Sequence, residues 1–258
     1  DAATQGFMDA INEALPGQVE FDEQNASGDI PTCATICNGF AASNVDLIMA
    51  NATPALQAAV SATDSIPILG TSVTEYGVAL DIDNFNGTVG GNISGTSDLA
   101  PLDQQADMLM ELLPDAQTVG ILYCSAEANS VYQAQVVEEC LTAAGKTVNV
   151  YTFADSNDVS SVTATACAEN DALYIPTDNT AASCTEAINN VAEPAGVPII
   201  TGEEGICKGC GIATLSISYY DLGYATGEMA VKILTGESDI SEMPIEYYPN
   251  PVKKYNAD

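Results

Sequence analysis

The sequence predicts an α/β protein built from parallel sheets and divided into two similar lobes. Short apolar runs alternate with helical segments, which is the pattern of parallel βαβ units. The chain has 258 residues, more than the roughly 150 that are typical of one domain. The two halves also repeat one pattern, because Thr53 and Asp178 each stand seven residues after an aspartate, close to the end of a predicted strand.

The first half opens on an amphipathic helix at residues 2–15, which Pro16 and Gly17 end. A doubly wound unit normally begins with a strand, so we expect that the first strand of this lobe preceded Asp1. The elements that follow are predicted as a strand at 19–24, a helix at 30–43, a strand at 45–50, a helix at 53–62 and a strand at 66–70.

Residues 71–95 are less regular, and a helix at 101–113 leads into the second half. The second series is predicted to have strands at 119–124, 147–153, 172–176, 197–201 and 212–216, with helices at 129–144, 159–168 and 180–195. A last helix at 220–234 and a short strand at 245–248 complete the prediction.

The charge balance excludes several functions. The chain has 36 acidic residues against 5 lysines, a formal charge of −31, which would repel nucleic acid and anionic lipid headgroups. It contains no histidine, the commonest general base and metal ligand, so we expect neither an enzyme nor a metal or cofactor site. Because arginine is also absent, an anionic ligand group would have to bind backbone N–H groups, hydroxyls, amides or a lysine.

The eight cysteines give little functional information. Cys207 and Cys210 have the spacing of a redox or metal motif, but a tetrahedral metal site needs two more ligands. We therefore expect either a local disulfide or two free thiols there. Cys33 and Cys37 lie four residues apart on a predicted helix, where burial among apolar residues is expected.

Polar residues gather where predicted strands end. Several of these clusters open helices, whose free N–H groups favour a carboxylate, and acidic residues among them could pair with an ammonium group. Together the two chemistries describe a site for a zwitterion such as an amino acid. Asp178 has a second interpretation, because aspartate also caps helix N-termini. We expect its carboxylate to bind the ligand's ammonium group.

At these positions the sequence resembles the substrate-binding proteins of ABC importers, and in particular the TrpX-like group associated with aromatic amino acids. The resemblance runs from about residue 1 to 237. It is carried by ANATPALQAA, IPILGTSVTEYG, GTSDLAPLDQQ, LLPDAQTVGILYCSAEANS, ALYIPTDNTAAS, VPIITGEEGICKGCGIATLSISYYDLG and GEMAVKILTGE.

The resemblance implies the type I periplasmic-binding-protein fold, with two Rossmann-like lobes, three hinge crossings and a ligand in the cleft. We expect residues 1–97 and 219–240 in the N-terminal lobe, and 98–218 and 241–258 in the C-terminal lobe. The implied ligand-binding residues are Thr53, Ser72, Ser125, Glu127, Asn129, Ser130, Thr177, Asp178 and Glu203. Tyr76, Phe85, Tyr219 and Tyr220 are candidates to stack on an aromatic ligand.

The resemblance predicts an extracytoplasmic receptor, either a lipoprotein or a periplasmic protein. It would act as a monomer, bind tryptophan, phenylalanine or tyrosine, and deliver this ligand to a membrane permease. Two alternatives remain open. One is a ligand-sensing regulatory or signalling domain of the same fold, and the other is a receptor for another small zwitterion or a nucleoside.

Overall fold

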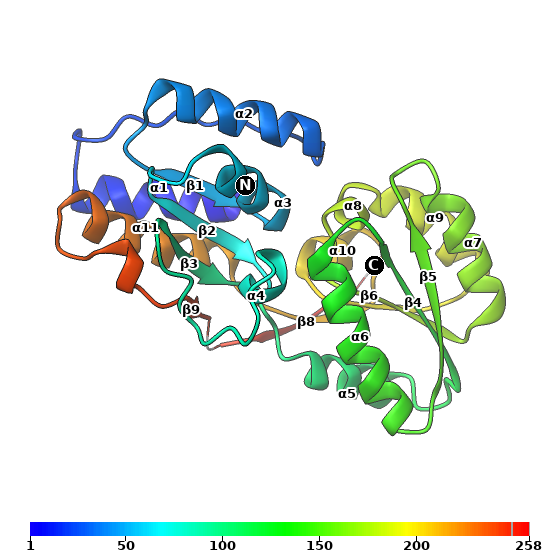
Figure 1. The fold of residues 1–258 in the computed structure, drawn as a ribbon. Helices are drawn as coiled ribbons and strands as arrows, with labels where there is room; N and C mark the ends of the chain where they lie inside the picture. The colour runs from blue at the N-terminus through cyan, green and yellow to red at the C-terminus, as the bar shows by residue number, and fades with distance from the viewer. Residues whose placement is uncertain (249, 258) are drawn as a thin grey trace. The chain divides into compact units, whose positions relative to one another are not determined.

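The structure is a computed structural model that describes residues 1–248 and 250–257, and it divides into two compact units. Unit 1 comprises Asp1–Leu99 and Ser218–Pro249, and unit 2 comprises Ala100–Ile217 and Asn250–Asp258. In each unit, helices cover both faces of a sheet (Figure 1). Both sheets consist mostly of parallel strands, which confirms the predicted α/β class.

Unit 1 holds a four-stranded parallel sheet in the order β1-β2-β3-β9. Its strands are β1 (Ile48–Asn51), β2 (Ile68–Val73), β3 (Ile93–Ser97) and β9 (Glu246–Tyr247). Its helices are α1 (Ala2–Ala14), α2 (Ile30–Ser43), α3 (Thr53–Ala62), α4 (Tyr76–Ala79), α11 (Tyr219–Leu234) and the 3-10 turn η1 (Ile240–Glu242).

Alternating residues of β2 point into the two cores of unit 1. Ile68 is buried in a cluster with apolar residues of α2, α3 and α4. Leu69, the next residue, is buried with apolar residues of α1 and α11. This period of two is what a strand covered on both faces requires, and it explains why β2 is almost wholly buried.

Unit 2 holds a six-stranded sheet in the order β10-β8-β7-β6-β4-β5, in which β10 is antiparallel to its neighbour. Its strands are β4 (Thr118–Cys124), β5 (Thr147–Phe153), β6 (Ala172–Ile175), β7 (Ile199–Thr201), β8 (Ala213–Ser216) and β10 (Val252–Tyr255). Its helices are α5 (Leu102–Leu112), α6 (Ala128–Ala143), α7 (Val159–Glu169), α8 (Asn179–Ser183), α9 (Thr185–Ala195) and α10 (Glu204–Cys210).

A buried amide in unit 2 joins α5 to the sheet. The Gln105 side chain donates to the carbonyls of Gly202 and Leu215 and accepts a 2.5 Å hydrogen bond from the Tyr174 hydroxyl. Tyr174 and Gln105 are both fully buried. All three bonds satisfy groups that would otherwise be costly to bury, so they fix the position of α5 on this face of the sheet.

The third boundary between the units differs from the expected one. Residues 241–248 were expected in the C-terminal lobe, whereas they group with unit 1. The reason is backbone pairing, because β9 aligns in parallel with β3, at Thr96↔Glu246 and Ser97↔Tyr247. The Ser94 hydroxyl also donates to the carbonyl of Met243. The other two boundaries lie at 99/100 and 217/218, where 97/98 and 218/219 were expected.

Several predicted elements are wrong in type or extent. No strand forms at 19–24, where Val19 and Phe21 instead pack against the α1–α11 core without a strand partner. The helix predicted at 180–195 is two helices, because Cys184 leaves the helical conformation with ψ 17°. Strands β3 and β10 and helices α4 and α10 were not predicted. All four β10 residues, Val-Lys-Lys-Tyr, are exposed, and their sequence does not alternate between apolar and polar residues. The sequence therefore gives no strand signal there.

Helices α1 and α11 pack at close range through glycines. A Cβ atom on Gly223 would lie 1.9 Å from the carbonyl oxygen of Ala3, and one on Gly6 would lie 2.1 Å from the carbonyl oxygen of Tyr220. Both obstacles are backbone atoms of the facing helix, which cannot rotate away. The contact therefore requires residues without a side chain at these positions.

We predict that Gly223→Ala destabilises unit 1 by about 1–3 kcal/mol or more, because the added methyl group forces the two helices apart. The matched control is Gly39→Ala in α2, where no atom lies within 4 Å of the added Cβ. That change should stabilise the helix by about 0.5–1 kcal/mol. Urea unfolding followed by circular dichroism measures both effects. Equal stability of Gly223→Ala and the unchanged protein would contradict the close packing.

Candidate functional site

The strand order of unit 2 places a topological switch point between β4 and β6. From β4 the chain passes through α6 to β5 on one side, and it returns through α7 to β6 on the other side of β4. The loops that follow β4 and β6 therefore meet at the carboxyl edge of the sheet. Open α/β sheets bind ligands outside such a point. Five of the predicted ligand-binding residues lie at its centre: Glu127, Asn129, Ser130, Thr177 and Asp178.

Asp178 joins the two loops by two short hydrogen bonds. Its Oδ1 accepts from the backbone N–H of Ala181 at 2.7 Å, which makes it the N-cap of α8. Its Oδ2 accepts from the backbone N–H of Cys124, at the end of β4, also at 2.7 Å. The side chain is only 1% exposed. The capping interpretation thus has direct structural support, while a contact between Asp178 and a ligand stays a prediction.

Glu127 completes the cap of α8 from the neighbouring loop. One of its oxygens accepts from the backbone and side-chain amides of Asn179, at 2.9 and 2.7 Å. The other accepts from the backbone N–H and hydroxyl of Thr180, at 2.9 and 2.8 Å. The two carboxylates together bind the first three backbone N–H groups of α8, so the start of this helix is fixed against β4.

Among the described residues, no cationic side chain pairs with the carboxylates of Asp178 and Glu127. Burial, followed by the negative charge of Glu127, raises the pKa of Asp178 to about 6, and the hydrogen bonds from Ala181, Cys124 and Ser130 oppose this rise. The two charges remain together because backbone and hydroxyl donors surround them.

Two amides on one face of α6 hold the backbone of Thr177. The side chain of Asn129 donates to the Thr177 carbonyl at 2.9 Å. Gln133 lies one turn further along the helix. It donates to the same carbonyl at 3.0 Å and accepts from the Thr177 N–H at 3.1 Å. The prediction missed Gln133, although its spacing of four residues from Asn129 would have placed it on the same face of α6.

The remaining predicted residues of unit 2 lie at the border of this network. Ser125 is exposed, and its hydroxyl donates to the carbonyl of Phe153. Glu203 follows β7 and caps α10 through the N–H groups of Gly205 and Ile206. A Cβ on Gly202 would lie 2.4 Å from the backbone nitrogen of Thr177, so β7 approaches the β6 loop closely.

The two predicted residues of unit 1 lie at the carboxyl ends of its strands. Thr53 is the first residue of α3 and is 2% exposed. Ser72 lies in β2 at an irregularity in the pairing with β3, and its φ of 54° is in the left-handed region. Such a conformation costs a non-glycine residue roughly 1–3 kcal/mol and is frequent at ligand sites.

Four buried side-chain oxygens lack a hydrogen-bond partner within the described chain. Hydrogen-bonding atoms that are buried normally find a partner, so each of these is a candidate contact for a bound molecule. They belong to Ser72, Asp98, Asn129 and Thr214. Three of the four lie beside the carboxyl end of a strand, at β2, β3 and β4.

The candidate stacking residues have other roles in the structure. Tyr76 is 1% exposed, and its hydroxyl donates to the carbonyl of Thr96 in the core of unit 1. Phe85 packs against the same core. Tyr220 is 39% exposed and donates to Asp9 on α1. Tyr219 donates to Asp98, which follows β3.

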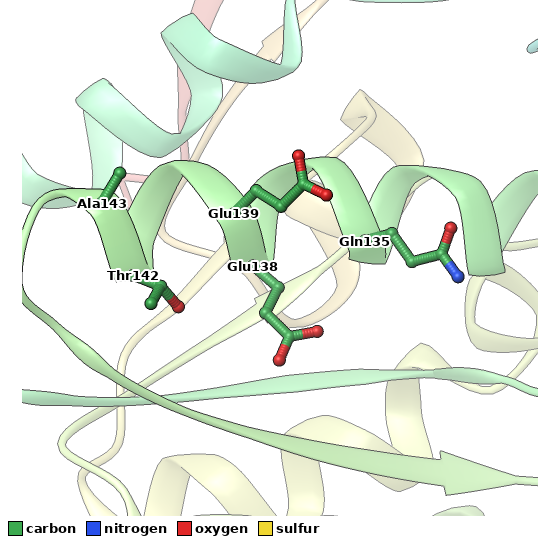
Figure 2. Close-up of a pocket in the computed structure, with 5 residues that line it drawn as sticks. All are labelled: Gln135, Glu138, Glu139, Thr142 and Ala143. Atoms are coloured by element: carbon green, nitrogen blue, oxygen red, sulfur yellow. The ribbon is translucent and has the colours of Figure 1, made fainter.

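The surface depression drawn in Figure 2 lies away from the switch point. The residues that line it, Gln135, Glu138, Glu139, Thr142 and Ala143, all project from α6. A groove along one helix cannot enclose a ligand, and two of its five side chains are acidic. We assign no function to it.

All eight cysteines are free thiols, including Cys207 and Cys210, both of which are buried residues of α10. Burial raises the pKa of Cys210 to about 12, so this thiol stays protonated and unreactive at neutral pH. No helix in the described part of the chain is both long enough and apolar enough to span a membrane.

Residues 1–251 match the family model described as "ABC transporter substrate binding protein". The chain belongs to this family. Its members are substrate-binding proteins and not a class of enzymes. They bind small molecules outside the cytoplasm and work with a membrane permease.

Similar proteins fit this assignment. The curated "Tyrosine-binding protein" of Clostridioides difficile strain R20291 is 33% identical over 251 residues, which cover 95% of this chain and 71% of that protein. An ABC domain from Streptococcus pneumonia, solved in complex with L-Trp, is 30% identical with a TM-score of 0.94, covering 99% of this chain and 87% of that one.

A third relative is a substrate binding protein with adhesive properties from Clostridium difficile, solved in a ligand-free, open structure. It is 35% identical with a TM-score of 0.71, and the match covers 100% of this chain and 88% of that one. These matches confirm the type I periplasmic-binding-protein fold and the predicted family.

We predict that the raised pKa of Asp178 produces a measurable pH dependence. An acid whose pKa is higher in the folded state than its usual 3.8 stabilises the protein below pH 3.8, and this contribution is lost as the pH rises through about 6. The free energy of unfolding of the unchanged protein, minus that of Asp178→Asn, should therefore fall as the pH rises from 4 to 6, by up to about 1.4 kcal/mol per pH unit. Urea unfolding at several pH values measures the slope.

Asp171→Asn is the control of opposite sign. The backbone N–H groups of Thr118 and Gln117 lower the pKa of Asp171, so its contribution is present above pH 3.8 and is lost as the pH falls. If the difference in unfolding free energy between the unchanged protein and Asp178→Asn does not change from pH 4 to 7, the pKa of Asp178 is not raised in the folded protein.

Proposed function

We propose that this protein is an extracytoplasmic receptor that binds a free aromatic amino acid and delivers it to a membrane permease. The observation that carries the proposal is that two relatives, each at least 30% identical over 95% or more of the chain, are described as binding tyrosine or complexed with L-Trp. We further propose a monomer that is attached to the outer face of the cell membrane as a lipoprotein, or is free in a periplasm.

The chemistry of the chain supports an amino acid ligand. Neutral donors and acceptors, among them Ser72, Ser125, Asn129 and Ser130, lie at the carboxyl ends of the strands, where ligands bind in this class of fold. With no arginine in the chain, hydroxyl, amide and backbone N–H donors would bind the ligand's carboxylate. We propose ligand contacts for Thr53 and Ser72 in unit 1. In unit 2 we propose them for Ser125, Asn129, Ser130, Thr177 and Glu203, and for Glu127 and Asp178, which also fix the backbone of their loops.

We predict that at least one of tyrosine, tryptophan and phenylalanine binds with a dissociation constant in the micromolar range or below. It should bind at least about tenfold more tightly than leucine, because an aromatic ring buries about 150–250 Å² of apolar surface. Isothermal titration calorimetry with protein freed of ligand by unfolding and refolding measures these constants.

Mass spectrometry of the compound released from the freshly purified protein provides an independent test. Release of an aromatic amino acid would support the proposal. Release of a nucleoside or a different zwitterion, together with no calorimetric response to the three aromatic amino acids, would contradict it.

A further inference from the structure

Asp98 is a buried carboxylate that the sequence patterns did not single out. It directly follows β3 in unit 1 and is 4% exposed. Its backbone N–H donates to the carbonyl of Val73, so it lies at the carboxyl ends of two neighbouring strands, β2 and β3. The side chain therefore occupies a sheet edge of the kind at which α/β proteins bind ligands.

Only one oxygen of Asp98 has a firm partner. The hydroxyl of Tyr219 donates to Oδ2 at 3.0 Å. Oδ1 is buried and makes no hydrogen bond within the described chain. Burial raises the pKa of Asp98, and the Thr74 and Tyr219 hydroxyls oppose the rise as hydrogen-bond donors, but the Thr74 hydroxyl makes no well-formed hydrogen bond to Oδ1. A buried carboxylate oxygen without a donor is costly, so something other than this chain is expected to supply one.

The charge that Asp98 lacks is not available within unit 1. Lys232 is the only lysine of this unit, and the chain has no arginine or histidine. Lys232 lies in the last turn of α11, whereas Tyr219, which contacts Asp98, is the first residue of that helix. Thirteen residues of helix separate them by roughly 20 Å. No lysine side chain of unit 1 is therefore placed to pair with Asp98, and a cationic occupant would supply the missing charge.

The surroundings of Asp98 favour an organic cation over a metal ion. Its neighbours Thr74 and Tyr219 contribute neutral hydroxyls. In residues 1–248 and 250–257, no three or more Cys, Asp or Glu side chains gather in a way that could hold a metal ion. Ser72 on the adjacent strand has a second buried oxygen without a partner. One carboxylate flanked by hydroxyls suits an ammonium group, which has three donors to distribute.

The corresponding carboxylates of unit 2 are already occupied. Both oxygens of Asp178 and both of Glu127 accept hydrogen bonds from this chain. Among the buried carboxylates of the described residues, Asp98 is thus the one with an oxygen that accepts no hydrogen bond. We propose that Asp98 accepts the ammonium group of the bound amino acid through Oδ1, which makes it a residue that selects ligands with a free amine. This inference rests on the proposed function.

The test compares Asp98→Asn with the unchanged protein, using tyrosine and its analogue without the amino group, 3-(4-hydroxyphenyl)propionate. If tyrosine is not the preferred ligand, the preferred aromatic amino acid and its deaminated analogue replace the pair. We expect Asp98→Asn to weaken amino acid binding by roughly 30-fold to several thousand-fold, and to change binding of the analogue by less than about threefold. The ratio of the dissociation constant of the analogue to that of the amino acid should therefore fall by about the same factor.

Stability gives a second readout that a merely structural role would not produce. Asp98→Asn removes a buried charge and keeps the shape of the side chain, so the ligand-free variant should be as stable as the unchanged protein or more stable. A residue that only supports the fold would show the reverse. Asp98→Ser, which is also neutral but smaller, is the second variant should the first fold poorly.

Asp178→Asn is the matched comparison, because it neutralises the other candidate acceptor. It should weaken binding of the amino acid and of its analogue by the same factor. The inference is overturned if Asp98→Asn weakens both ligands equally or neither, or if Asp178→Asn is the variant that loses the preference for the amine. These outcomes differ from failure of the proposed function, in which the unchanged protein itself binds no aromatic amino acid.

Discussion

The structure depends on one constraint, which is that buried carboxylates must be stabilised without cationic side chains. The chain carries 36 acidic residues, five lysines and no arginine, so salt bridges can neutralise few of its charges. An ion pair joins Lys254 to Glu204, but it lies on the exposed surface. Inside the protein, backbone N–H groups and hydroxyls take over this role. Helix N-termini are well suited to it, because they present unpaired N–H groups and the positive end of the helix dipole.

The switch point of unit 2 shows how this constraint builds a rigid site. Glu127 and Asp178 belong to two loops that are about fifty residues apart in sequence, yet together they satisfy the N-terminus of α8 and the N–H group at the end of β4. Two like charges close together would ordinarily repel. Seven donors surround them, three for Asp178 and four for Glu127, and they oppose this repulsion. Beside them, Asn129 donates to the carbonyl of Thr177.

At the carboxyl edge of its sheet, unit 1 has buried oxygens without a hydrogen-bond donor, in contrast to the carboxylates of unit 2. There the hydroxyls of Thr71, Thr96 and Thr226 bond one another in the core, and Tyr76 donates to the carbonyl of Thr96, so these polar groups below the edge have partners within the protein. At the edge itself Ser72 is held in a left-handed conformation, and Asp98 keeps an oxygen without a donor. This arrangement suits a binding protein. The hydrogen-bonded interior supports the sheet edge, and the polar groups at that edge that lack a partner are left to bind the ligand.

The sequence by itself determined the fold class, the family and the places where polar residues meet the ends of strands. These depend on local information: the period of apolar residues, helix caps and the spacing of motifs such as the one around Asp178. Most helices and central strands were predicted within a few residues for the same reason. The exposed strand β10 and the glycine-containing strand β3 lack such a local signal, because their pairing is set by the neighbouring strands.

Only the tertiary structure decided what each polar side chain contacts. The sequence could not show that Glu127 reaches across to α8, that Gln133 holds both backbone groups of Thr177, or that Tyr219 meets Asp98 from 121 residues away. It equally could not show which buried oxygens remain without a donor. Hydrogen bonding depends on atoms brought together by strand order, and strand order is set by packing over the whole chain.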